Sequence, residues 1–248
     1  MFARVVVLTI AVMLLAGCMM TGNGVTVGGP GGAVVGSGNV ITKDYDFSGF
    51  SRVAVGNAFK VEVQQGQSYA VSVTVDDNVE QYLDVKQEGD QVRIYLKPRL
   101  MLSLRNVRLE ARITMPEVTG LDFSGATRAT VTGFESNKRL DVEVSGASRV
   151  SGDITAGETS MNVSGASTVE LRGAATGLDL EASGASTLKL ADMPASDARV
   201  RASGASRIQV NVSGSLTGDA SGASTVEYEG KPTNVRVDTS GASSVRSR

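Results

Sequence analysis

The 248-residue chain contains no histidine, no tryptophan and a single cysteine. Without histidine, a Ser-His-Asp triad is excluded and the common zinc sites are disfavoured. One cysteine cannot form a disulfide within one chain. The 24 basic and 26 acidic side chains give a net charge of −2, without the basic surplus of a non-specific nucleic-acid binder. We therefore expect no catalytic residue, no cofactor, no metal and no nucleic-acid partner.

A Ser-Gly-Ala tripeptide recurs through the second half of the chain. The copies begin at Ser124, Ser145, Ser164, Ser183, Ser203, Ser221 and Ser240. The steps between neighbouring copies are 21, 19, 19, 20, 18 and 19 residues. A repeat of about 20 residues is typical of a solenoid, in which each repeat stacks on the one before it.

The residues on either side of this tripeptide alternate between apolar and polar. Before the Ser145 copy, for example, Val142 and Val144 flank Glu143, and Val150 follows it. Alternation with a period of two indicates half-buried strands. Each rung therefore has at least two strands, and the scarcity of aromatic residues agrees with a thin interior of small aliphatic side chains. Because parallel strands joined by crossovers are almost always right-handed, the sequence predicts an all-β, right-handed parallel β-helix.

The glycine of each tripeptide is predicted to form a structural corner between two strands, where the backbone needs a positive φ. These corner glycines are Gly125, Gly146, Gly165, Gly184, Gly204, Gly222 and Gly241. The serines around them are expected to hydrogen-bond nearby backbone or to stack from rung to rung.

Two charged columns flank the corner and are candidate surface binding columns. The first is mostly acidic and contains Asp122, Glu143, Glu181, Asp219 and Asp238. The second contains Arg128, Arg149 and Arg207. Stacking places Asp122 over Glu143 and Asp219 over Asp238, at a spacing of about 5 Å that makes them repel. Either the arginines pair with them across the corner, or a divalent cation or cationic partner neutralises them.

The N-terminus predicts a cell-envelope address. Residues 1–17 carry one positive charge and then an apolar run too short to span a membrane, which is typical of a signal peptide. The run ends in Leu15-Ala16-Gly17-Cys18, which resembles the bacterial lipoprotein box and predicts lipidation of Cys18. Met19 is not aspartate, which by resemblance to the enterobacterial sorting rule implies the outer membrane, on its periplasmic or outer surface.

Residues 18–43 are rich in glycine and are predicted to be a flexible tether after the lipidated cysteine. Residues 44–248 are predicted to form one β-helix domain, with an irregular N-terminal cap over 44–116 and the repeats over 117–248. Within the cap, residues 79–83 are expected to form a helical turn with an acidic cap, and 83–86 and 92–96 a hairpin around Glu88-Gly89-Asp90.

Several stretches resemble the GIN-domain family, described as head domains of auto-transporter adhesins. They are Phe50-Ser51-Arg52-Val53, Phe59-Lys60-Val61-Glu62-Val63 before Gln65-Gly66, Asp76-Asp77-Asn78 and the recurring Ser-Gly-Ala-Ser. The resemblance covers residues 45–245. It implies a right-handed β-helix in a bacterial secreted or lipoprotein chain, and no residue role is transferred.

These features favour a non-enzymatic envelope lipoprotein whose β-helix serves as a binding or adhesion scaffold. The expected partners are the membrane, through the lipid, and a glycan or an envelope protein. The alternative is a carbohydrate-active β-helix enzyme, a polysaccharide lyase or hydrolase, for which the carboxylates are the only candidate groups. A groove with converging carboxylates would favour the enzyme, and a shallow open face would favour the scaffold.

Overall fold

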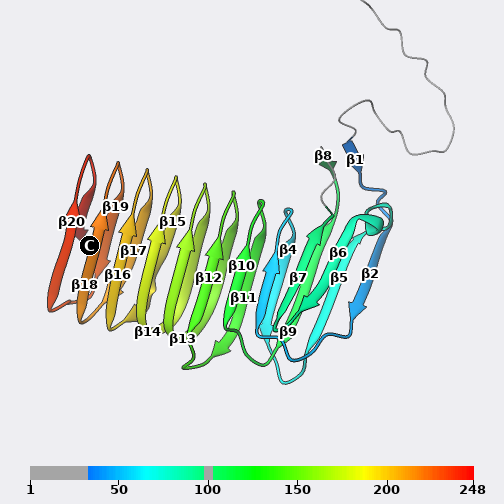
Figure 1. The fold of residues 1–248 in the computed structure, drawn as a ribbon, viewed down its shortest axis with the longest axis horizontal. Coiled ribbons are helices and arrows are strands. Elements are labelled where there is room, and N and C mark those ends of the chain that lie inside the picture. Colours follow the sequence, from blue (N-terminus) through cyan, green and yellow to red (C-terminus); the bar gives the residue numbers. More distant parts are fainter. Residues whose placement is uncertain (1–32, 98–102) are drawn as a thin grey trace, which may run out of the picture.

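A computed structural model of the chain describes residues 33–97 and 103–248, which form a long solenoid of stacked strands (Figure 1). The predicted signal peptide 1–17 and the lipidation site Cys18 lie outside the described residues. Within the two described ranges, no helix is long and apolar enough to cross a membrane.

The structure contains 21 strands and one short helix in its described part. The first strands are β1 (Ala33–Val35), β2 (Val40–Tyr45), β3 (Arg52–Val55), β4 (Lys60–Gln65) and β5 (Ala70–Asp76), followed by the 3₁₀ helix η1 (Asp77–Tyr82). Next come β6 (Leu83–Glu88), β7 (Gln91–Leu96), β8 (Ser103–Arg105), β9 (Leu109–Met115), β10 (Gly120–Phe123), β11 (Arg128–Glu135) and β12 (Leu140–Val144). The remainder are β13 (Arg149–Val163), β14 (Thr168–Ala182), β15 (Thr187–Ala195), β16 (Asp197–Ala202), β17 (Arg207–Val212), β18 (Ser215–Ala220), β19 (Thr225–Glu229), β20 (Asn234–Thr239) and β21 (Ser244–Ser247).

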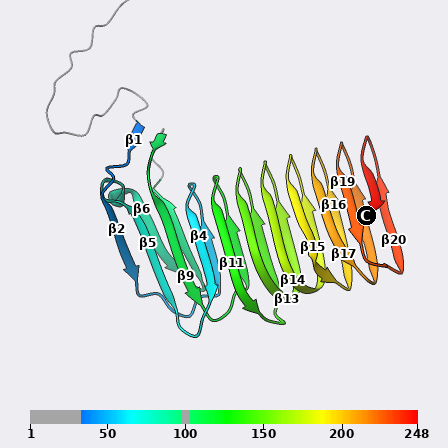
Figure 2. The same ribbon diagram turned by 180° about the vertical axis from the view of Figure 1, so that it is seen from behind.

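The repeats build two ladders of parallel strands. The first ladder contains the strands that precede each Ser-Gly-Ala turn, in the order β10, β12, the second half of β13, the second half of β14, β16, β18 and β20. The second ladder contains those that follow the turn, in the order β11, the first halves of β13 and β14, then β15, β17, β19 and β21. Figures 1 and 2 show the rungs stacked side by side along the long axis. The predicted all-β parallel helix is confirmed.

The core lies between the two ladders and follows the alternation seen in the sequence. Val142 is buried, and its register partners on the neighbouring rungs are Leu121 and Met161. The residues that alternate with them along each strand, such as Glu143, point to solvent. Each rung thus buries a thin layer of aliphatic side chains, which burial stabilises by about 25 cal/mol per Å² of apolar surface.

The regular rungs begin earlier than the first Ser-Gly-Ala copy. Strands β3 and β4 lie directly against β10 and β11, and Gly56-Asn57-Ala58 forms the turn between them. The residues between β4 and β10 fold back over the far side of this rung. There the pairing includes antiparallel contacts, β2 with β5, β5 with β9 and β6 with β7, and these strands form the N-terminal end (Figure 1).

Two sequence expectations about the N-terminal part need correction. The tether predicted over 18–43 is too long, because β1 pairs with β8 and β2 pairs with β5. The helical turn exists as η1, but Asp76 does not cap it through its side chain. Its buried carboxylate instead accepts hydrogen bonds from the backbone N–H groups of Gly38, at 2.9 Å, and Arg108, at 2.6 Å. The expected hairpin is confirmed by the pairing of β6 with β7.

Candidate binding faces of the solenoid

The Ser-Gly-Ala turns form a continuous line along one edge of the solenoid. The seven glycines have φ values between +64° and +76°, which disfavour residues with a β-carbon. The rungs also approach closely here: the backbone N–H of Ala166 donates to the carbonyl oxygen of Gly146 at 2.8 Å. A β-carbon on Gly165 would lie 2.3 Å from that same oxygen. The glycines therefore serve both the turn and the stacking of one turn on the next.

The residue three positions after each turn serine has a structural role, either inside its own turn or against the preceding rung. Ser148, Ser167, Ser186, Ser206 and Ser224 are buried. The hydroxyl of Ser148 donates to the carbonyl oxygen of Ser145 at 2.9 Å, and that of Ser186 to the carbonyl oxygen of Val163 at 3.1 Å. Because these hydroxyls are satisfied by backbone, they are not available as nucleophiles or ligand contacts.

The outward face of the first ladder carries the predicted acidic column, which is interrupted by Asn162 and Arg201. Asp122 and Glu143 are direct register partners, as are Asp219 and Asp238. Arg201 stands between Glu181 and Asp219. We call the outward surface of β10, β12, β13, β14 and β16 the acidic face.

A depression of about 270 Å³ lies in the acidic face. Its charged lining residues are Arg52, Asp141, Glu143, Asp179, Glu181 and Arg201. Asp141 and Asp179 belong to a second outward column, four residues before the turn serine, which the sequence reading did not single out. The same period-two pattern that located the first column places these carboxylates two residues earlier on the same strands.

Arginines bind most of the carboxylates around this depression. Arg201 contacts Asp179 at 3.1 Å and Glu181 at 3.8 Å. Arg139 contacts Asp141 at 2.9 Å. The arrangement is thus a network of surface ion pairs, each worth at most about 1 kcal/mol.

Asp122, at the edge of this network, is in a different environment. It forms no ion pair in the described part of the chain, and it is half-buried. Burial raises the pKa of its carboxyl group, and the neighbouring Glu143 raises it further. Burial likewise raises the pKa of the nearby Tyr95, with Asp122 adding to the effect. The sequence located this carboxylate, but only its packing shows that it is perturbed.

The arginine column lies on the second ladder and does not neutralise the acidic column. No ion pair among the described residues joins Arg128, Arg149 or Arg207 to a carboxylate of the first ladder. The reason is geometric: the two ladders lie on opposite sides of the core, so side chains that point away from the core on each ladder diverge. The expected pairing across the corner is therefore wrong. The described residues also contain no group of three or more acidic or cysteine side chains placed to hold a metal ion.

This architecture defines a class of protein, a β-solenoid with long, regular outer faces. The chain belongs to the family described as "Putative auto-transporter adhesin, head GIN domain", whose model matches residues 49–232. This confirms the family resemblance read from the sequence. The family indicates an envelope or surface protein with an adhesin-like role. No curated protein matches the chain.

Solved structures of low sequence identity share the fold. A "putative adhesin" from Bacteroides fragilis is 20% identical with a TM-score of 0.81, and the match covers 87% of this chain and 100% of that one. A "putative lipid binding protein" from Parabacteroides distasonis is 19% identical with a TM-score of 0.71, over 87% and 99% of the two chains. A "putative adhesin" from Parabacteroides merdae is 14% identical with a TM-score of 0.68, over 87% and 99%.

Proposed function

We propose that this chain is a non-enzymatic lipoprotein of the cell envelope that presents its solenoid as an adhesion scaffold. The observation that carries the proposal is the register of the outward side chains. Charged residues of the same sign on consecutive rungs are direct register partners, as Asp122 and Glu143 are, so like groups stack in short runs along the long axis. A surface that repeats about every 4.8 Å suits an extended or repetitive ligand.

The lipid anchor is part of the same proposal. Its support is the sequence Leu15-Ala16-Gly17-Cys18 at the end of an apolar run, together with a family that contains envelope proteins. With the anchor at the N-terminus, the Ser-Gly-Ala rungs, which lie toward the C-terminal end of the chain, would be the part farther from the membrane. The proposed site is the outer membrane, on its periplasmic or outer surface.

The alternative function is a carbohydrate-active enzyme, and one feature favours it. Asp122 and Glu143 are adjacent carboxylates, and the pKa of Asp122 is raised, as in a general acid. Against this, the other carboxylates around the depression are bound by Arg201 and Arg139, and the depression is small and open. We therefore favour the scaffold.

Adhesion of living cells tests the scaffold. Bacteria that express the full chain are compared with bacteria carrying an empty vector for attachment to surfaces coated with defined polysaccharides or envelope proteins. We expect chain-dependent attachment to at least one surface, without chemical change of the ligand. Equal attachment with and without the chain would overturn the proposal. Cleavage of a polysaccharide that is lost in Asp122→Asn would replace the scaffold with the enzyme.

The anchor is tested separately by Cys18→Ser. Cells are labelled with a radioactive fatty acid and fractionated. We expect the parent chain to carry label in the membrane fraction, and the variant to remain an unprocessed precursor or to lack lipid. A variant that is processed, labelled and fractionated like the parent would refute lipidation at Cys18.

A further inference from the structure

The second ladder has two neighbouring outward columns, one with charges of both signs and one with three cations in a row. One column runs through Arg112, Glu62, Thr130, Ser151, Glu170, Lys189, Gln209, Glu227 and Arg246. It contains three cations and three carboxylates, and neighbouring residues of opposite sign form ion pairs between rungs. Arg112 contacts Glu62 at 3.1 Å, and Lys189 contacts Glu170 at 3.2 Å. This column neutralises itself.

The adjacent column instead stacks three cations on successive rungs. Lys60 is the register partner of Arg128, and Arg128 is the register partner of Arg149. At a rung spacing of about 4.8 Å these like charges repel one another. Lys60 reaches Glu62 at 3.8 Å, but neither Arg128 nor Arg149 forms an ion pair with any residue that the structure describes. We call Lys60, Arg128 and Arg149 the basic stripe.

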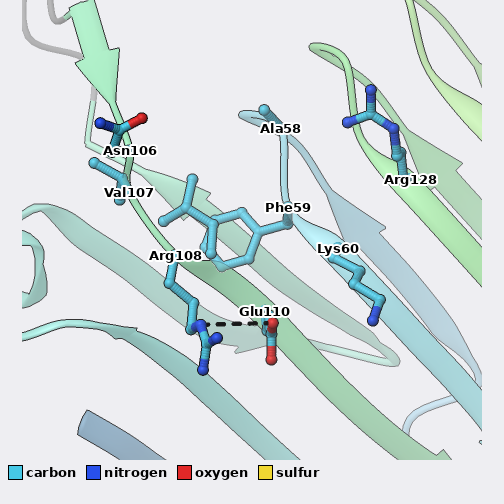
Figure 3. Close-up of a pocket in the computed structure, with 9 residues that line it drawn as sticks. Ala58, Phe59, Lys60, Asn106, Val107, Arg108, Glu110 and Arg128 are labelled. Carbon is cyan, nitrogen blue, oxygen red and sulfur yellow. Dashed lines mark ion pairs between the residues drawn. The ribbon is translucent and has the colours of Figure 1, made fainter. Parts of the chain in front are cut away.

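A depression of about 400 Å³ lies at the N-terminal end of the basic stripe. Lys60 and Arg128 line it together with Arg108 and Glu110, and Figure 3 shows these side chains around the buried ring of Phe59. Arg108 contacts Glu110 at 3.8 Å, and the lining as a whole carries three cations and one carboxylate. The backbone of Asn106 adds a turn with a positive φ at the rim.

We propose that the basic stripe and this depression bind an anionic polysaccharide that carries a carboxylate on each sugar and runs along the solenoid axis. The length of one sugar unit in an extended chain is comparable to the spacing of the rungs, so a polymer lying along the axis brings several carboxylates within reach of the long side chains of the stripe. A net charge of −2 gives the protein no general attraction for polyanions. Local binding therefore needs a cluster of unpaired cations, and the basic stripe supplies one. The proposal deepens the proposed adhesion function and rests on it.

Binding of polygalacturonate to the full chain tests the proposal. The stripe variant carries Lys60→Gln, Arg128→Gln and Arg149→Gln. The control variant carries Arg199→Gln, Lys231→Gln and Arg236→Gln, which remove the same charge from exposed residues that form no ion pair in the described ranges. We expect the stripe variant to bind about tenfold or more weakly, with a shallower salt dependence, while the control variant and the parent bind alike. Neutral dextran should not bind.

Three outcomes would overturn the inference. They are equal binding by the stripe variant and the parent, an equal loss in both triple variants, and equally tight binding of a single-stranded polynucleotide, which would show unspecific attraction to any polyanion. Thermal melting of both variants checks that they remain folded. The attachment assay separates the two proposals: cells carrying the stripe variant that attach like the parent would refute the stripe while the adhesion function stands, whereas no chain-dependent attachment would refute the adhesion function.

Discussion

Gly165 stacks on Gly146 so closely that a β-carbon on Gly165 would come 2.3 Å from the carbonyl oxygen of Gly146. The following turns repeat the arrangement, with corresponding distances of 2.5 to 2.8 Å for Gly184, Gly204, Gly222 and Gly241. Asn57 holds the equivalent position in the turn between β3 and β4, with a φ of +60°. The stacked turns thus favour glycine for two reasons, the positive φ and the close approach of the preceding turn. Mutation can separate these two effects.

Replacing Gly165 with valine is expected to destabilise the protein by about 1–3 kcal/mol, because a β-branched residue meets both the positive φ and the preceding rung. Alanine substitutions at Gly165 and at Gly89 separate the two effects. Gly89 is the control, since its φ is +60° but nothing lies within 4 Å of an added β-carbon. Gly165→Ala should therefore lower the melting temperature more than Gly89→Ala does. Equal losses of melting temperature in the two alanine variants would mean that only the backbone angle matters. A Gly165→Val variant that is as stable as the parent would refute the role of Gly165 as a corner residue.

Asp122→Asn should change how stability depends on pH. The folded-state pKa of Asp122 is raised, mainly by burial and then by Glu143, so the folded protein holds this proton to higher pH than the unfolded chain does. Ionisation therefore lowers stability as pH rises from the unfolded value of about 3.9 through the folded-state pKa.

The asparagine variant should consequently melt at a higher temperature than the parent at pH 7, and the difference should disappear below about pH 3.9, where both are uncharged at this position. Glu143→Gln should also raise the melting temperature at pH 7, but by less, because it removes only the repulsion between Glu143 and Asp122 and leaves the burial of Asp122 unchanged. Parallel melting curves for parent and Asp122→Asn across this pH range would contradict the assignment.

Arg246→Leu should weaken the C-terminal end of the solenoid. Glu227 is nearly buried between rungs, where it accepts hydrogen bonds from Gln209, at 2.7 Å, and from Nε of Arg246, at 3.0 Å. These two bonds lower the pKa of Glu227. Removing one donor should cost about 1–2 kcal/mol.

Because the folded-state pKa of Glu227 is lowered, this loss should be present at neutral pH and fade as pH falls and the carboxyl group becomes protonated. Denaturant unfolding at pH 7 measures the loss of stability, and unfolding at pH 3 measures how far that loss has faded. Arg199→Leu, at an exposed arginine without an ion pair in the described chain, is the control and should change stability little. Equal effects of the two substitutions would show that the contact with Glu227 contributes nothing.

Millimolar Ca²⁺ is expected to leave the melting temperature unchanged. Asp219 and Asp238 stack as register partners, but two carboxylates supply too few oxygens for a strong calcium site. A rise with Ca²⁺ that is abolished by Asp219→Asn with Asp238→Asn would place an ion on this pair. A rise that survives the double substitution would place the ion elsewhere on the protein.

The sequence by itself determined the repeating part of the fold. Parallel stacking at a fixed period leaves each rung in nearly the same environment, so the same residue types recur, and one sequence suffices to show turn, inward side and outward side. Asp122 and Glu143, or Arg128 and Arg149, could be paired correctly from the repeat alone. The period-two alternation then separated core from surface.

Only the tertiary structure decided which of these columns face one another. The sequence placed the acidic and basic columns six residues apart around a turn and suggested contact, but the ladders lie on opposite sides of the core and the outward side chains diverge. It also did not show that β3 and β4 lie against β10 and β11, because this non-local contact forms only when the intervening residues fold back as the N-terminal end. Local pattern fixes the direction of a side chain, whereas its partners depend on how distant strands pack.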